Sequence, residues 1–223
     1  MYCNTPKKHI ENKHYKDEYI QKLCSIKTKM NEAKIIDKPK VHSQIESKSA
    51  EIGFSMPSDI YVGTLLKTLI TSKPKSNILE LGTGIGLSLS WMIDGLDSES
   101  RLTTVDNNSE LIKIANEFFG TDSRVEIVCQ DGSEWIKNYK GDNFDLVFAD
   151  AWPGKYSETD EIFELIRVGG FYVIDDMQSQ SNWQYGQQEN VDKHIEYLEK
   201  REDFSPTKMN WSTEVIIMTK KYC

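Results

Sequence analysis

The feature that most constrains this chain is the regular placement of acidic residues at the ends of strand-like segments between residues 77 and 176. The segments are short, apolar and separated by helix-like stretches, and they cover residues 78–81, 102–105, 125–128, 144–148 and 171–174. Apolar strands that alternate with helices are typical of a parallel sheet with helices on both faces. Ligands of such sheets bind at the edge where the strands end. We therefore expect one acidic crevice, lined by Glu80, Asp106, Asp131, Asp150 and the pair Asp175 and Asp176.

A glycine-rich loop at residues 82–86 follows the first strand and precedes a helix. Glycine lets such a loop take positive φ angles and lets a ligand approach the backbone closely. The dinucleotide fingerprint GxGxxG would need a glycine at position 87, which is Leu87. Because the carboxylate of Glu80 would lie near any phosphate, a cationic ligand suits this loop better than a pyrophosphate. An NAD-type oxidoreductase is therefore the less favoured alternative.

Two further strand ends carry residues that could hold a nucleoside. Asp106 can accept hydrogen bonds from both hydroxyls of a ribose. Alternatively, Asp106 could cap the next helix, although Ser109 is the residue that we expect in that position. Asp131 is followed by Gly132 and Ser133, where an adenine edge could be read. An Asp-Gly pair is also common in plain turns, so both interpretations of Asp131 stay open.

Charge and composition exclude several classes of partner. The net charge is −8, which disfavours nucleic acid as the main partner. The longest apolar stretches are strand-length, far below the roughly 20 residues of a membrane span, and no apolar segment follows the basic N-terminus. The four cysteines form no CxxC pair. We therefore expect a cytoplasmic protein with reduced thiols and no membrane span.

The charge is unevenly distributed along the chain. Residues 1–50 hold eleven lysines against six acidic residues, whereas the remainder is strongly acidic. We expect an N-terminal basic helical extension over residues 1–50 and an acidic domain over residues 51–223. The extension is either a solvated helical face or a lid or oligomer contact.

Several motifs together resemble one family. They lie at residues 53–57 (GFSMP), 78–86 (ILELGTGIG), 106 (Asp), 144–150 (FDLVFAD) and 169–176 (GGFYVIDD). With them the chain resembles the class I S-adenosylmethionine-dependent methyltransferases. Among these it is similar to the small O-methyltransferases of the catechol and caffeoyl-CoA type and their bacterial relatives, over about residues 53–220.

The resemblance implies an α/β fold, with a Rossmann-like seven-stranded, mostly parallel sheet whose last strand is antiparallel and helices on both faces. The antiparallel strand agrees with a hairpin that residues 207–218 predict. The implied reaction is transfer of a methyl group from S-adenosylmethionine to a hydroxyl of a small aromatic acceptor. The segment before Met56 is implied to pack over the active site and to build a homodimer in many members.

The resemblance also implies roles for individual residues. Glu80, Gly82, Gly84 and Ser88 would line the methionine part of the cofactor, and Asp106 would hold the ribose. Ser133 would approach the adenine, and Asp150 and Trp152 would flank the cofactor. The full set of candidate cofactor residues is Met56, Glu80, Gly82, Thr83, Gly84, Gly86, Ser88, Asp106, Asn107, Asp131, Gly132, Ser133, Asp150 and Trp152.

A divalent cation is the second implied cofactor. In metal-dependent members an Asp after the fourth strand and an Asp-Asn pair after the fifth bind the metal, and the matching positions are Asp150, Asp175 and Asp176. Three carboxylates suit Mg²⁺ or another hard divalent cation. The alternative is that Asp175 or Asp176 acts as a general base, or only forms hydrogen bonds at the strand end.

Two departures from the family pattern bear on catalysis. Asp176 replaces the family's Asn, and Pro153 stands where the family has its catalytic Lys. Lys155 could substitute only if the loop around it re-aimed the side chain. The candidate catalytic residues are therefore Asp150, Asp175 and Lys155. A protein that binds S-adenosylmethionine without transferring methyl groups to hydroxyls, or that acts on an amine, remains an alternative.

Aromatic residues and histidines complete the expectations. Trp152 and Trp183 are candidates for the wall of an acceptor pocket, whereas Trp211 is expected to pack in the core. All four histidines are expected at the surface, with His194 on the exposed face of a helix and His42 in the N-terminal extension.

Overall fold

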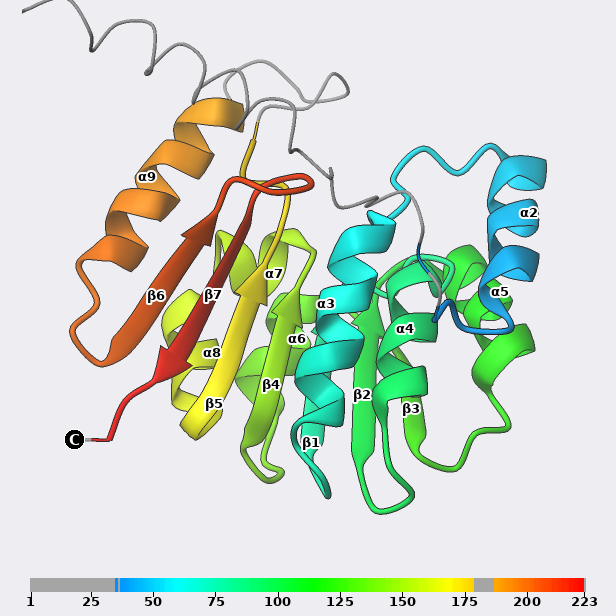
Figure 1. Cartoon of the computed structure of the whole chain (residues 1–223), viewed down its shortest axis with the longest axis horizontal. Coiled ribbons are helices and arrows are strands. Elements are labelled where there is room, and N and C mark those ends of the chain that lie inside the picture. Colours follow the sequence, from blue (N-terminus) through cyan, green and yellow to red (C-terminus); the bar gives the residue numbers. More distant parts are fainter. Residues whose placement is uncertain (1–34, 36, 179–186, 223) are drawn as a thin grey trace, which may run out of the picture. The chain divides into compact units, whose positions relative to one another are not determined.

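The computed structural model describes residues 35, 37–178 and 187–222 (Figure 1). The chain forms two compact units, Met1–Asp37 and Lys38–Cys223, and nearly all of the described residues belong to the second. Trp183 and most of the basic extension lie outside the described residues. The extension over residues 1–50, its action as a lid and the homodimer therefore stay predictions.

The second unit is built on one seven-stranded sheet with the order β3-β2-β1-β4-β5-β7-β6. Neighbours from β3 to β5 pair in parallel, and β7 is antiparallel to both β5 and β6. The mostly parallel sheet with an antiparallel last strand is thus confirmed. The strands are β1 (Asn77–Leu81), β2 (Arg101–Asp106), β3 (Val125–Cys129), β4 (Phe144–Ala149), β5 (Ile166–Ile174), β6 (Phe204–Met209) and β7 (Val215–Lys220).

Helices cover both faces of this sheet, as predicted (Figure 1). Alternate residues of β1 enter two separate apolar clusters: Ile78 packs with residues of α3 and α4, whereas Leu79 and Leu81 pack with residues of α8 and α9. This alternation is the two-residue period of a strand that is buried on both faces. The helices are α2 (His42–Ile52), α3 (Ile60–Thr71), α4 (Leu87–Gly95), α5 (Ser109–Phe119), α6 (Gly132–Asn138), α7 (Trp152–Lys155), α8 (Thr159–Glu164) and α9 (Gln187–Glu199).

Side-chain caps mark the beginning of α3, α5 and α6. Asp59 caps α3 by accepting a 2.7 Å hydrogen bond from the backbone N of Tyr61. The expectation that Ser109 caps α5 is wrong by one residue, because the side chain of Asn108 accepts the capping hydrogen bonds and Ser109 is the first helical residue. A cap of this kind stabilises a helix by about 1 kcal/mol.

The predicted C-terminal hairpin is present and closes the sheet. β6 and β7 pair from Phe204–Lys220 to Met209–Val215. Trp211, in the turn between them, packs against the ring of Tyr61 with 5.8 Å between centroids, in agreement with a packing role. Among the described residues, none of the helices combines the length and the apolar character that crossing a bilayer requires.

Candidate functional site

The tips of the central strands contact one another through backbone atoms. The backbone N of Asp150 donates to the carbonyl of Leu81 at 2.9 Å, and the N of Gly82 donates to the carbonyl of Val105 at 2.9 Å. A Cβ atom on Gly82, where φ is +102°, would lie 2.7 Å from the carbonyl oxygen of Asp150. Glycine at position 82 is therefore required both by its backbone conformation and by the approach of the neighbouring strand.

Asp106 joins the glycine loop to the start of α5. One carboxylate oxygen accepts from the backbone N of Gly84 at 2.9 Å, and the other accepts from the backbone N of Asn108 at 2.9 Å. Since each carboxylate oxygen has two lone pairs, Asp106 still has acceptor sites for a ligand hydroxyl. Its neighbour Asn107, also a cofactor candidate, lies in the same loop and is exposed.

Glu80 lies beneath the glycine loop and is fully buried. Its two oxygens accept hydrogen bonds from Ser88 Oγ at 2.5 Å and from Thr104 Oγ1 at 2.6 Å. Thr104 Oγ1 is in turn 2.6 Å from Thr83 Oγ1. Burial raises the pKa of Glu80 to about 7, although both hydroxyls favour the ionised form. Three of the predicted cofactor residues, Glu80, Thr83 and Ser88, thus form one buried network that braces the loop.

The candidates for the adenine lie at the start of α6. The carboxylate of Asp131 caps that helix by accepting from the backbone N of Glu134 at 3.0 Å. Ser133 Oγ donates to the carboxylate of Glu158 at 2.7 Å. A Cβ on Gly132 would lie 3.0 Å from Pro153, so this turn touches the loop that follows β4.

The remaining cofactor candidates differ in exposure. Met56 and Trp152 are 67% and 52% exposed. Gly86 takes a φ of +92°, and a Cβ there would lie 2.8 Å from the ring of Phe119. Two of these candidates are thus exposed side chains, whereas Gly86 occupies a position with no room for a larger residue.

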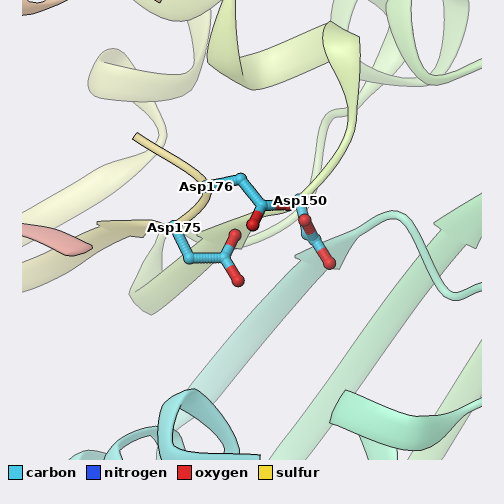
Figure 2. Close-up of side chains that lie close together, drawn as sticks. All are labelled: Asp150, Asp175 and Asp176. Carbon is cyan, nitrogen blue, oxygen red and sulfur yellow. The ribbon is translucent and has the colours of Figure 1, made fainter. Parts of the chain in front are cut away.

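Asp150, Asp175 and Asp176 form one cluster of carboxyl groups at the ends of β4 and β5. A carboxylate oxygen of each lies within 4.8 Å of the others, and Figure 2 shows the three groups gathered at one point. Asp176 has a φ of +50°, a left-handed conformation that Asp tolerates better than most residues do. Burial is the main cause that raises the pKa of all three carboxyl groups, and repulsion from neighbouring carboxylates adds to it.

This cluster fits a hard divalent cation. Oxygen atoms are the ligands that Mg²⁺, Ca²⁺ and Mn²⁺ prefer. Asp175 is buried, and its Oδ1 atom has no hydrogen-bond partner. A buried oxygen without a partner is costly, and a cation among three carboxylates would satisfy it and relieve their repulsion.

The loop after β4 turns Lys155 into the cluster. Pro153 (φ −64°, ψ 134°) and Gly154 (φ 84°, ψ −19°) have the dihedral angles of the two central residues of a type II turn. Lys155 is 5% exposed, and its Nζ donates to the carbonyl oxygen of Asp175 at 2.5 Å. The re-aiming of Lys155, which the sequence left open, is thus present in the loop.

Two residues that the sequence analysis did not single out also reach the cluster. Ser58 Oγ donates to a carboxylate oxygen of Asp150 at 3.4 Å, and Thr213 Oγ1 accepts from the backbone N of Asp176 at 3.4 Å. Ser58 directly follows the GFSMP motif, so its position offered a signal. Thr213 lies in the hairpin turn, and nothing local in the sequence indicates that it reaches the end of β5.

The expectation that His42 and His194 lie at the surface is wrong. His194 is 7% exposed and packs against the ring of Tyr156, 5.4 Å between centroids, and burial lowers its pKa to about 4. His42 is 1% exposed, and its Nδ1 lies 2.8 Å from Ser90 Oγ. Tertiary packing, which periodicity within a helix does not report, buries both rings.

An aromatic-lined hollow of about 410 Å³ lies beside the loop that holds Lys155. The aromatic rings that line it include Trp152, Tyr156, His194 and Tyr197, and acidic and basic side chains of α8 and α9 complete its wall. Trp152 therefore lies at this cavity, and its role in the wall of an acceptor pocket stays a prediction.

The fold, together with the glycine loop and the acidic residues at the ends of the parallel strands, defines a Rossmann-like protein of the class I methyltransferase type. A family model described as O-methyltransferase matches residues 32–205, which is more than half of the chain. The chain belongs to this O-methyltransferase family.

Individual relatives agree with this assignment. A protein from Mycobacterium ulcerans that carries the provisional name O-methyltransferase is 32% identical over 120 residues, which are 51% of this chain and 53% of the relative. The chain thus spans about half the length of such curated relatives. A similar protein from Mycobacterium leprae is 29% identical over 144 residues, 62% of this chain and 64% of the relative.

Solved structures support the fold. An O-methyltransferase from Bacillus cereus, in complex with SAH (S-adenosylhomocysteine), has a TM-score of 0.71 at 20% identity, over 93% of this chain and 97% of the other. The O-methyltransferase TomG from Streptomyces achromogenes, in complex with SAM (S-adenosylmethionine), has a TM-score of 0.72 at 20% identity, over 93% of this chain and 96% of the other.

Proposed function

We propose that this chain transfers a methyl group from SAM to a hydroxyl of a small aromatic acceptor. The observation that carries the proposal is the carboxyl cluster at the ends of β4 and β5, beside the glycine loop, in a member of the O-methyltransferase family. An acidic rim suits a sulfonium cation better than it suits the phosphates of a dinucleotide. The SAH and SAM held by two structural neighbours support the same cofactor.

The cofactor would lie along the ends of β1, β2 and β3. The glycine loop allows close approach at Gly82 and Gly84, and the free lone pairs of Asp106 suit the ribose hydroxyls. Gly132 and Ser133 would approach the adenine. Glu80 would contribute by holding the loop in shape through Ser88 and Thr104, since its side chain is fully buried.

The task of the protein is to align the acceptor oxygen with the methyl group and to accept the hydroxyl proton. A phenol has a pKa near 10, so it needs help to ionise at neutral pH. Asp150, Asp175 and Asp176 would hold a divalent cation, which when bound lowers the pKa of the acceptor hydroxyl. A carboxylate of the cluster would accept the proton, and the rings of Trp152 and Tyr156 would position a flat acceptor.

The first test is binding of SAH to the full chain by isothermal titration calorimetry. Asp106→Ala should weaken binding by about tenfold to a hundredfold, because it removes the acceptor for the ribose and a contact that holds Gly84. Asp142→Ala is the matched control, since Asp142 is exposed and precedes the opposite end of β4. Absence of heat with the unaltered protein, or equal affinity of Asp106→Ala, would contradict the proposal.

A SAM-binding protein without methyl transfer is the second candidate. It is favoured by Pro153, which stands where the resemblance places a catalytic Lys, and by the hydrogen bond that engages Lys155. This candidate predicts SAH binding without methyl transfer to a panel of catechols, phenols and amines, with or without Mg²⁺. Transfer to any phenol of the panel would reject it.

A further inference from the structure

The buried ammonium group of Lys155 lies beside the carboxyl cluster, and the chemistry proposed above does not use it. Its Nζ atom donates a hydrogen bond to the backbone carbonyl of Asp175, not to a carboxylate. A buried ammonium group needs compensating negative charge nearby. The cluster is the nearest source of such charge, because the carbonyl that Lys155 contacts belongs to Asp175, whose carboxyl group is one of the three.

The loop holds Lys155 in place on both sides. The hydroxyl of Tyr172 donates to the carbonyl of Gly154 at 2.7 Å, and the backbone N of Gly154 donates to the carbonyl of Ser157 at 2.7 Å. A Cβ on Gly154, where φ is +84°, would lie 2.3 Å from a methyl carbon of Leu81. The turn therefore packs tightly on β1, and these contacts fix the backbone from which the side chain of Lys155 projects.

A fixed ammonium and a bound divalent cation would compete for the same negative charge. Three carboxylates around one divalent cation leave one negative charge, which the ammonium of Lys155 balances. The charges of the ammonium and the metal ion also repel each other, and this repulsion is strong where water is excluded.

We propose that Lys155 is an internal cation of this site, which lies beside the carboxylates and weakens the binding of a divalent ion by repulsion. The inference deepens the proposed methyltransferase function and rests on it. Lys155 is in this view a positioning residue: it orients the main chain of Asp175 and sets the affinity of the cluster for metal ions.

The experiment measures the affinity of the full chain for Mn²⁺ by electron paramagnetic resonance and calorimetry. Lys155→Met removes the charge and keeps the length of the side chain. We expect it to bind Mn²⁺ at least about tenfold more tightly than the unaltered protein does, whereas Lys155→Arg should stay near the original affinity. Unchanged or weaker binding by Lys155→Met would overturn the inference.

Lys73→Met is the matched control. The Nζ of Lys73 also donates to a backbone carbonyl, that of Gly169 at 2.8 Å, but in the first half of β5 and away from the cluster. This variant should leave Mn²⁺ affinity unchanged, and an equal gain in affinity would show a general effect of charge and overturn the inference. If Lys155→Met does not fold, Lys155→Gln takes its place, with folding judged by thermal unfolding.

Two further measurements separate the inference from the proposed function. Mn²⁺ should raise the unfolding temperature more in Lys155→Met than in the unaltered protein, and an equal rise would count against an internal cation. SAH titration of the same samples tests cofactor binding independently of Mn²⁺. If Lys155→Met abolished methyl transfer while Mn²⁺ affinity stayed the same, Lys155 would be the proton acceptor and the inference would be wrong.

Discussion

Two buried acidic sites lie at the same edge of the sheet, and they differ in how their oxygens are satisfied. Both oxygens of Glu80 accept short hydrogen bonds from hydroxyl groups. In the carboxyl cluster, by contrast, Asp175 Oδ1 is buried without a partner, and the hydroxyl of Ser58 lies 3.4 Å from a carboxylate oxygen of Asp150. Burial raises the pKa values in both places, so burial alone does not distinguish them.

The difference favours a structural role for Glu80 and a ligand-binding role for the cluster, and both roles stay predictions. A satisfied buried carboxyl group stabilises its surroundings, whereas an unsatisfied one costs free energy until something binds it. Four variants test this contrast.

The largest effect is expected for Asp175→Asn. Removing the most buried carboxylate of the cluster should lower Mn²⁺ affinity by about a hundredfold, because the site loses a charged ligand. The free energy of unfolding should not fall at pH 8, since a buried group with a raised pKa is removed. Calorimetry with Mn²⁺ and urea unfolding measure the two quantities. Loss of stability with unchanged Mn²⁺ affinity would assign a structural role to the cluster as well.

Glu80→Gln should change how stability depends on pH. The pKa of Glu80 is about 7 in the folded chain, above the ordinary value of 4.5 that we take for the unfolded chain. The stability that this group contributes is complete below pH 4.5 and is lost as pH rises, because the unfolded chain releases the proton first. The total loss above pH 7 is about 3 kcal/mol.

Urea unfolding at pH 5 and pH 8 measures this effect. The unaltered protein should lose more stability between the two values than Glu80→Gln does. The carboxyl cluster contributes with the same sign in both proteins, so the difference reports Glu80. Equal losses would show that Glu80 is ionised in the folded chain at pH 5.

The smallest effects concern the hydroxyl groups. Ser88→Ala should cost about 1–2 kcal/mol of unfolding free energy, because it leaves one buried oxygen of Glu80 without a donor. Thr213→Val should cost less than about 0.5 kcal/mol, because it removes a 3.4 Å contact at a half-buried position. Thermal or urea unfolding compares them, and a larger cost for Thr213→Val would reverse the assignment of the two sites.

Much of the fold follows from local patterns in the sequence. The strand segments are apolar and short, and the acidic residues follow them directly, so the sheet and the gathering of Asp150, Asp175 and Asp176 at one edge were predictable. The hairpin was predictable as well, because two strand-like runs stand on either side of a short polar turn.

The rest depends on contacts between segments distant in the sequence. Charged neighbours made the helix around His194 look exposed, yet Tyr156 of another loop covers the ring. The contact of Thr213 with Asp176 exists only because β7 pairs with β5. The inward direction of Lys155 depends on how its turn packs against Leu81, which the Pro-Gly pair alone does not reveal.

The left-handed backbone at Asp176 has a consequence for how such a protein can evolve. At a φ of +50°, asparagine is tolerated about as well as aspartate, whereas β-branched side chains are strained. One nucleotide change converts an aspartate codon into an asparagine codon. Selection can therefore alter the formal charge next to Asp175 by one unit in a single mutational step, without refolding the end of β5.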